Sequence, residues 1–343
     1  MRRNGELEVL ALLGALWLLL LCLLRVATQA TATPSCTIFT AARDGQVLFG
    51  NNEDHHYRDL VVGLQPASAA SDGSVHLGVR KPDGAIVYCG AVNQFGLAWD
   101  VNTTPRSRLN PHPERPRSHA EDNFLTALTK RATTVEGAIR LAKTYDFGSA
   151  MASHIHIADA TGDAVIISAG PDGELAFTRI DGREGHLVST NFNRADYRAS
   201  EVGWRYETAI DMLVELGADR PLTPDYATSI LDAVHLNMLT TYTLYSNAVD
   251  LPNKVIHLNY MSQYGETAVL DIADELAKGA RVASMRDLFS ADTTTSGDLA
   301  YGRFERRFTA AKTVVVALAA ALLCGAGYLV ARVAQGRARR RPL

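Results

Sequence analysis

The sequence is poor in cysteine, lacks an excess of basic charge in its central part, and has none of the common nucleotide-binding motifs. Four cysteines in 343 residues exclude a mini-protein held together by many disulfides. Residues 36–307 hold 25 basic and 35 acidic side chains, and this net charge of −10 argues against nucleic acid as a partner. No GxSxG elbow, Walker loop or GxGxxG fingerprint occurs. The composition, 47% hydrophobic and 21% charged, is nevertheless that of a chain with a core.

A long uncharged apolar run near the N-terminus predicts export. Two arginines precede residues 9–24, and the small-x-small sequence at 30–32 follows them. This is the order of a secretory signal peptide, which we assign to residues 1–32. Cleavage after Ala32 leaves residues 33–35 as a short pro-segment. Cleavage after Ala30 and an uncleaved signal anchor are the alternatives.

A second uncharged run, residues 313–331, is long enough to cross a bilayer as one helix. Five arginines follow it, so residues 332–343 are expected to form a basic cytoplasmic tail. The polar stretch before the run predicts a juxtamembrane stalk over 289–312. The protein is therefore expected to be a single-pass membrane protein whose main domain, residues 36–288, is extracytoplasmic.

The central domain alternates short apolar stretches with turn signals, which is typical of antiparallel strands. Residues 36–50 predict a hairpin around Asp44-Gly45. Residues 119–146 have the spacing of two helices, residues 204–217 predict an amphipathic helix closed by Gly217, and 224–239 predict a further helix. Helices segregated between blocks of strands indicate an α+β fold.

Two of the cysteines, Cys36 and Cys89, lie in the predicted exported domain, since Cys22 falls in the signal and Cys324 in the membrane segment. A disulfide between Cys36 and Cys89 is one interpretation. The other follows from the position of Cys36, close to the expected start of the mature chain. An N-terminal cysteine can act alone, because its α-amine accepts the thiol proton near neutral pH and returns it to a leaving group.

Several ordered motifs resemble those of a known family. CTIFTAARDGQVLFGNNED, GAVNQFGLAWDVN, STNF, Trp204-Arg205-Tyr206 and LYSNAVDLPNKVIHL are similar, in this order, to motifs of N-terminal-nucleophile (Ntn) amide hydrolases of the choloylglycine hydrolase and penicillin V acylase type. Acid ceramidases and isopenicillin acyltransferases are more distant relatives. The resemblance covers nearly all of residues 36–275 and implies a four-layer αββα sandwich.

The resemblance also implies roles for five residues. Cys36 is the nucleophile and its amine the base, and Asp54 holds that amine through a charge-assisted hydrogen bond. Asn191 donates its side-chain amide to the oxyanion, and Asn102 supplies the second donor from its backbone. Arg205 completes the charge network near the thiolate.

Asn51 departs from the family pattern, in which bile-salt hydrolases have arginine, and we expect it to line the substrate site instead. Asn102 has a competing interpretation as a surface glycan site, because it begins the one N-x-[ST] sequon of the chain. His154 and His156 are two residues apart on an expected strand, but a zinc site needs three or four ligands. We expect neither a metal nor another cofactor.

Together these features predict an exported, membrane-anchored cysteine amidohydrolase that cleaves linear N-acyl amides through an acyl-thioester on Cys36. Its partners are expected to be a small-molecule substrate and the membrane, and the sequence leaves a homo-oligomer open. An acyltransferase on the same fold, and a disulfide-bridged binding ectodomain without catalysis, are the alternatives.

Overall fold

The computed structural model describes residues 36–55, 57–119, 123–180, 185–217 and 220–338. The expected signal peptide and pro-segment, residues 1–35, lie outside the described residues, as do residues 339–343 of the expected tail. Contacts divide the chain into two units, one formed by residues 34–237 and 241–301 and the other by 1–33, 238–240 and 302–343. The first unit contains both sheets, and the second contains most of the long C-terminal helix.

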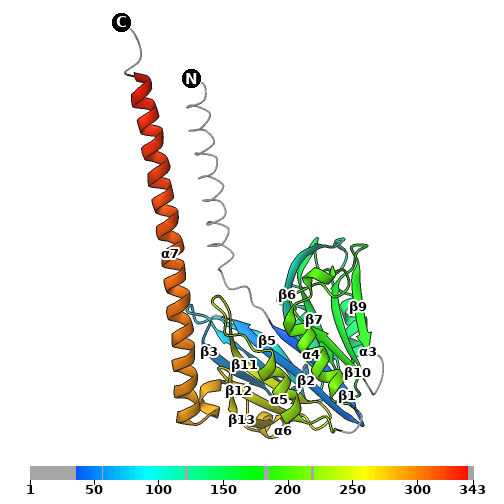
Figure 1. Ribbon diagram of the computed structural model, residues 1–343. Helices are drawn as coiled ribbons and strands as arrows, with labels where there is room; N and C mark the ends of the chain where they lie inside the picture. The colour runs from blue at the N-terminus through cyan, green and yellow to red at the C-terminus, as the bar shows by residue number, and fades with distance from the viewer. Residues whose placement is uncertain (1–35, 56, 120–122, 181–184, 218–219, 339–343) are drawn as a thin grey trace. The chain divides into compact units, whose positions relative to one another are not determined.

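A six-stranded antiparallel sheet carries the N-terminal hairpin in its middle (Figure 1). Its order is β10-β1-β2-β11-β12-β13. The bounds of these strands are β1 Thr37–Arg43, β2 Gln46–His55, β10 Gly185–Ser189, β11 Tyr242–Asp250, β12 Val255–Tyr260 and β13 Gln263–Asp271.

An eight-stranded antiparallel sheet packs against the first sheet, with β1 contacting β6 and β7. Its order is β14-β3-β4-β5-β6-β7-β8-β9. The bounds are β3 Asp59–Gln65, β4 Ser74–Arg80, β5 Ile86–Asn93, β6 Ala98–Arg108, β7 Ala150–Ala158, β8 Ala164–Ala169, β9 Leu175–Ile180 and β14 Arg281–Ser284.

Helices cover the outer face of each sheet and complete four layers. Helices α2 (Phe124–Arg131) and α3 (Val135–Ala142) share an apolar core with strands β5 to β9 of the larger sheet. Helices α4 (Trp204–Glu215) and α5 (Pro224–Ala233) share a second core with β1, β2, β10 and β11 of the smaller sheet. The short α6 (Ile272–Ala277) follows β13. The predicted four-layer αββα architecture is therefore confirmed.

The expected helices form, and one is shorter than predicted. Caps at Asn123 and Thr134 start α2 and α3, because their side chains accept backbone N–H groups of the first turn. Helix α5 ends at Ala233 rather than at residue 239. Beyond it, Leu236 and Thr243 exchange hydrogen bonds, the Leu236 N–H donating to the Thr243 hydroxyl at 2.8 Å. The chain leaves the helix early because it pairs with the start of β11.

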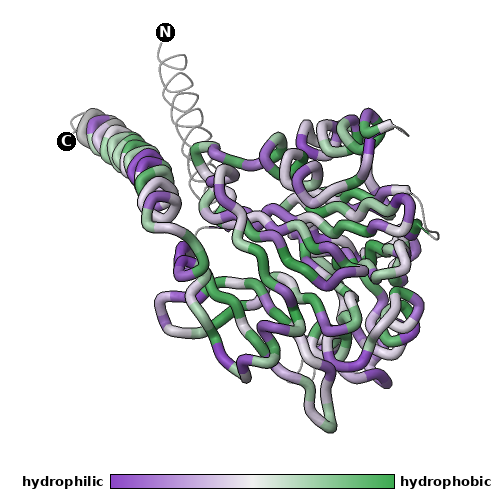
Figure 2. Tube along the Cα trace, turned by 90° about the horizontal axis from the view of Figure 1, so that it is seen from below, coloured by the Kyte–Doolittle hydropathy of each residue, from purple (hydrophilic) through white to green (hydrophobic). Residues whose placement is uncertain are grey.

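Helix α7 (Ala291–Ala338) has 48 residues and contains the predicted membrane segment. Its part Ala291–Gly325 is long and apolar enough to cross a membrane, with a mean hydropathy of 1.9 in its most apolar window. Figure 2 shows apolar residues following one another along this helix. The stretch expected to be a stalk is helical from Ala291. Thr294 is buried there, and Gly297 packs closely against Tyr260.

The β1–β2 hairpin fixes which side chains face the space between the sheets. Asp44 and Gly45 have φ values of 50° and 80°, so they form a two-residue turn of the kind that joins tightly paired strands. From this turn, β1 and β2 pair without a register shift up to Thr37, which lies opposite Asn52. The next pair along this register is Cys36 and Glu53. Because strand residues alternate between faces, these two side chains project to the same side of the sheet.

Candidate active site

Cys36 lies at the start of β1 with its side chain sealed between the two sheets. The residue is 1% exposed, and its thiol donates to Glu53 Oε2 at 3.4 Å. A backbone hydrogen bond links the same sulfur to Asp54. The thiol is therefore in direct contact with a carboxylate, and the register of the hairpin produces this contact.

A second buried carboxylate stands close to this pair. Asn51 Nδ2 donates to Asp100 Oδ2 at 2.8 Å, and Glu53 accepts hydrogen bonds from Asn51 and from the half-buried Cys89. Gly90 makes room for the Asp100 carboxylate, since a Cβ there would lie 2.3 Å from Oδ2. We call Cys36, Asn51, Glu53, Cys89 and Asp100 the acidic cluster. Cys36 and Cys89 are both free thiols, so the disulfide of the alternative prediction is not formed in the structure.

Burial governs the protonation of the acidic cluster. It raises the pKa of Glu53 to about 7, although hydrogen bonds from the neighbouring thiols and from Asn51 oppose the shift. It also raises the pKa of the Cys36 thiol well above its usual value, and the charge of Glu53 raises it further. Burial and the Glu53 charge act in the same direction on the pKa of Asp100. Burial makes the charged form of each of these groups costly, so it favours their protonated forms.

Arg205, in the first turn of α4, joins three groups on the other face of β1 and β2. Its guanidinium donates to the Thr37 hydroxyl at 2.8 Å, to Asp54 Oδ2 at 3.3 Å and to Asn191 Oδ1 at 2.7 Å. Asp54 is fully buried and the arginine side chain is 12% exposed. The predicted residues Asp54, Asn191 and Arg205 are therefore brought together next to the backbone of Cys36.

Asp54 is held at both oxygens, one by Arg205 and the other by the Thr243 hydroxyl. Burial raises its pKa to about 8, and the positive charge of Arg205 works against this shift. Asp54 lies one residue beyond Glu53 and so projects to the opposite face of the sheet, away from the thiol side chain. Its place suits contact with the backbone at the start of β1.

Asn102, on β6, is fully buried and binds the backbone of Cys36. Its Nδ2 donates to the Cys36 carbonyl at 2.8 Å. Its Oδ1 accepts from Ser189 Oγ at 2.7 Å and lies 2.7 Å from His154 Nε2. The interpretation of this asparagine as a surface glycan site is wrong for the folded chain, because the side chain is 0% exposed and occupied.

His154 and His156 project from β7 into the same buried network, as their spacing predicted. His156 Nε2 lies 3.0 Å from the Thr40 hydroxyl, and His156 Nδ1 lies 2.9 Å from the Ser189 hydroxyl. Burial lowers the pKa of His154 to about 3 and that of His156 well below its usual value, so both rings are neutral. Within the described residues, no three His, Cys, Asp or Glu side chains are grouped in a way that could hold a metal ion.

Asn191 and Asn51 make contacts that the sequence did not predict. Asn191 donates its amide to the Thr103 carbonyl at 2.8 Å while its oxygen accepts from Arg205. Asn51 faces Asp100 rather than an open substrate site. Sequence reasoning missed Glu53 and Asp100 as neighbours of the thiol. The signal for Glu53 was present, because the Asp-Gly turn alone sets it opposite Cys36.

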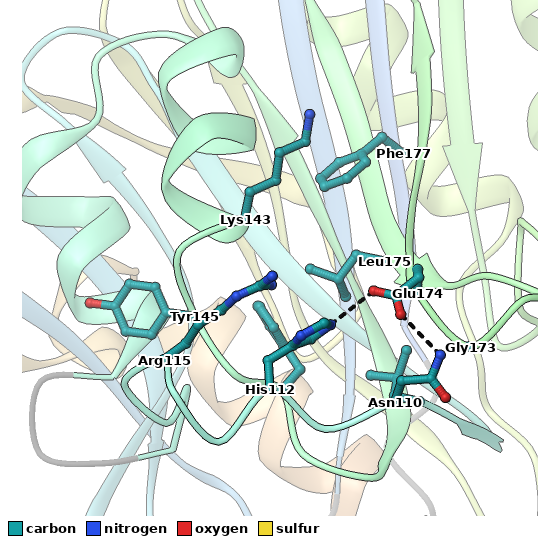
Figure 3. Close-up of a pocket in the computed structure, with 11 residues that line it drawn as sticks. Asn110, His112, Arg115, Lys143, Tyr145, Gly173, Glu174, Leu175 and Phe177 are labelled. Atoms are coloured by element: carbon teal, nitrogen blue, oxygen red, sulfur yellow. Dashed lines mark hydrogen bonds and ion pairs between the residues drawn. The ribbon is translucent and has the colours of Figure 1, made fainter.

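A cavity of about 290 Å³ lies elsewhere on the domain (Figure 3). It sits beside α3 and β9, with Lys143 near the ring of Phe177 and His112 bound to Glu174. The residues that line it include no member of the acidic cluster and none of Thr37, Asp54 and Asn191, the partners of Arg205. The thiol site and this cavity are therefore separate features of the molecule.

Comparisons with solved structures identify the fold. Two variant forms of a conjugated bile acid hydrolase from Clostridium perfringens each match with 13% identity, covering 73% of this chain and 96% of theirs, with TM-scores of 0.51 and 0.52. Penicillin V acylase from Agrobacterium tumefaciens matches with 14% identity and a TM-score of 0.50, covering 72% of this chain and 90% of its own. No protein-family profile and no curated protein sequence matches. The resemblance predicted from the motifs is confirmed at the level of architecture: this chain has the Ntn-hydrolase sandwich fold of the choloylglycine hydrolase and penicillin V acylase type.

Proposed function

We propose that this protein is an exported, membrane-anchored amide hydrolase that uses the Cys36 thiol as its nucleophile. The observation that carries the proposal is the position of Cys36 immediately before β1, buried beside Glu53 and held through its carbonyl by Asn102. The fold shared with a bile acid hydrolase and a penicillin V acylase supports amide chemistry. The long apolar part of α7 supports a single-pass anchor.

The mature enzyme requires that the chain be cut before Cys36. Cutting this bond converts the backbone nitrogen of Cys36 into a free amine beside the Arg205 contacts. In this proposal Asp54 holds that amine, and the added positive charge lowers the pKa of Asp54 from the raised value of the uncut chain. The amine then serves as a proton acceptor for the thiol.

The acyl-transfer steps follow from this arrangement. Cys36 Sγ attacks the amide carbonyl, the tetrahedral oxyanion is stabilised by the Asn191 amide and the backbone N–H of Asn102, and the amine leaves. Water then hydrolyses the acyl-thioester. An N-acyl amide with an apolar acyl group is the proposed substrate class, since an anchored enzyme meets such amphiphiles at the bilayer surface.

The test combines protein chemistry with an activity screen. The full chain, solubilised in mild detergent, is sequenced from its N-terminus and treated with iodoacetamide, with peptide mapping of the label. We expect a chain that begins at Cys36 and carries the label there. We expect it to hydrolyse N-acyl 4-nitroanilides of increasing acyl length, and Cys36→Ala to abolish this activity.

Cys89→Ala is the matched control for the labelling, because it removes the other thiol of the domain and leaves Cys36 in place. A chain that begins upstream of Cys36 and takes up iodoacetamide only after reduction would contradict the proposal. That result would favour the disulfide-bridged binding domain. Transfer of the acyl group to an added amine, in place of its release as acid, would reassign the enzyme as an acyltransferase.

A further inference from the structure

The cavity beside α3 and β9 has no part in the proposed function, and its lining combines apolar and cationic side chains. Its volume of about 290 Å³ is at the lower end of the range of small-molecule sites, which is roughly 300–1,000 Å³. All the residues that line it belong to the unit that contains both sheets. The size therefore suits a small organic molecule.

The apolar part of the cavity is continuous with the core of the larger sheet. Leu109, Tyr145 and Phe147 are buried members of that core. Leu175 and Phe177, both on β9, are half-buried and pack against it. A ring or a short acyl chain placed here covers apolar surface that water otherwise contacts, which favours binding.

Two cations at this cavity are available to an anion. Lys143, the C-cap residue of α3, holds its Nζ 5.4 Å from the centroid of the Phe177 ring. Within the part of the chain that the structure describes, no carboxylate forms an ion pair with it. Arg115 pairs with Glu114 at 3.3 Å, but both side chains are partly exposed, and such a pair contributes little. Figure 3 shows the Arg115 guanidinium directed toward the middle of the cavity.

Glu174 is the single carboxylate among the described residues that line the cavity, and the cavity wall already binds it. It accepts a hydrogen bond from Asn110 Nδ2 at 2.9 Å, and its Oε2 lies 2.9 Å from His112 Nε2. Hydrogen bonds from Asn110 and His112 lower the pKa of Glu174. Its charge is therefore engaged away from Lys143, and two cations face one carboxylate in a domain whose net charge is −10.

Backbone hydrogen bonds fix the wall that carries His112 and Arg115. The His112 N–H donates to Asp146 Oδ1 at 3.0 Å, and the Arg115 N–H donates to the His112 carbonyl at 2.9 Å. The Asp146 N–H donates in turn to the Pro116 carbonyl at 2.8 Å. Because this wall is already ordered, a ligand loses less binding free energy to the ordering of the protein.

We propose that this cavity binds a small carboxylate that carries an aromatic ring or a short acyl chain. The carboxylate lies between Lys143 and Arg115, where charge-assisted hydrogen bonds are available. Its apolar part lies against Leu175, Phe177 and Tyr145. The inference goes beyond the proposed function and does not rest on it, because the cavity shares no residue with the acidic cluster or with the partners of Arg205.

The experiment measures how ligands protect Lys143 from reductive dimethylation by formaldehyde and cyanoborohydride. The full chain in mild detergent is labelled, and peptide mass spectrometry follows each lysine. Phenylpropionate and hexanoate are the probes, one aromatic and one acyl. We expect at least one of them to slow labelling of Lys143 in a saturable manner, with a Kd on the order of 1 mM. Labelling of Lys81, in the turn between β4 and β5, is expected to stay unchanged.

Two matched ligands test the two parts of the proposed occupant on the wild type, so this comparison does not depend on the folding of a variant. Phenylpropanol lacks the charge, and acetate lacks the apolar part. Both are expected to protect Lys143 less well than the probes.

Arg115→Gln is the test variant, and it is expected to weaken protection by the probes about three- to tenfold. Arg140→Gln is its matched control, since Arg140 is an exposed cation of α3 that does not line the cavity. We expect it to leave the Kd unchanged.

The outcomes divide cleanly. Protection by phenylpropionate alone, or by hexanoate alone, supports the inference and names the ligand as an aromatic or an acyl acid. Unchanged labelling of Lys143 far above the expected Kd overturns it. Equal protection by phenylpropanol or by acetate also overturns it, because binding then needs only apolar contact or only screening of charge. An Arg115→Gln chain that binds as tightly as wild type overturns it too. None of these results changes the standing of the proposed function.

Discussion

Replacing Glu53 by glutamine is expected to change how the stability of the fold depends on pH. An unpaired glutamate ionises near pH 4.5, whereas burial raises the pKa of Glu53 in the folded chain to about 7. Between these two pH values the folded chain holds a proton that the unfolded chain has lost. The unfolding free energy of the wild type therefore falls as the pH rises through this window. Glutamine does not titrate, so the unfolding free energy of the variant does not fall for this reason.

The magnitude follows from the size of the pKa shift. A shift of about 2.5 pKa units at 1.36 kcal/mol per unit corresponds to about 3 kcal/mol. The unfolding free energy of Glu53→Gln, relative to wild type, should rise by about this amount between pH 4.5 and pH 8. Removal of the Glu53 charge also lowers the pKa of the neighbouring Asp100, which acts in the same direction.

The assay is urea unfolding of both chains in the same detergent, followed by tryptophan fluorescence at several pH values. The buried histidines, whose lowered pKa values make stability rise with pH below about pH 6.5, are present in both chains and cancel in the difference. A constant difference between the two chains across this range would refute the reasoning. It would mean that Glu53 is not desolvated in the folded protein.

Three further predictions test the packing around the site. Gly90→Ala places a Cβ 2.3 Å from the Asp100 carboxylate, so a loss of roughly 1–3 kcal/mol is expected by urea unfolding, whereas Gly265→Ala, with nothing within 4 Å, serves as the tolerated control. Asn102→Ala removes three buried hydrogen bonds and should lower the unfolding free energy by about 3 kcal/mol or more. Mass spectrometry of the folded wild-type chain should find Asn102 without a glycan. Arg205→Lys cannot reproduce three fixed guanidinium bonds, so kcat/KM for the amide substrate should fall at least about tenfold; an unchanged value would remove Arg205 from the mechanism.

The elements that local chemistry specifies were predictable from the sequence. The Asp44-Gly45 turn defines the first hairpin, the caps at Asn123 and Thr134 start two helices, and the apolar run at 313–331 lies inside α7. Each of these signals acts over a few residues, so its outcome depends little on the rest of the chain. The end of α5 was mispredicted because the residues just beyond the helix pair with the start of β11, where the Leu236 N–H donates to the Thr243 hydroxyl, and this pairing overrides the helical pattern.

The candidate site likewise contains residues that the local sequence predicts and residues that only tertiary packing brings there. Cys36 was predicted as a site residue from its position and chemistry. The register of the hairpin places Glu53 opposite Cys36, and this neighbour could have been predicted from the turn and the alternation of strand residues. Asp100 could not be found in this manner, because it reaches the acidic cluster from the other sheet. The same holds for the Asn102 side chain, whose sequon indicated a surface position while packing buried it against the Cys36 carbonyl.

The sequence by itself indicated Cys36 as the candidate nucleophile, and it predicted the hairpin that follows this residue and the apolar segment at 313–331. These are properties of local pattern and residue type. The tertiary structure decided which carboxylates stand next to the thiol, which one pairs with Arg205, and how strongly each retains its proton. Those properties depend on the packing of two sheets against each other, because desolvation and the distance between charges arise only when segments far apart in the sequence are brought into contact.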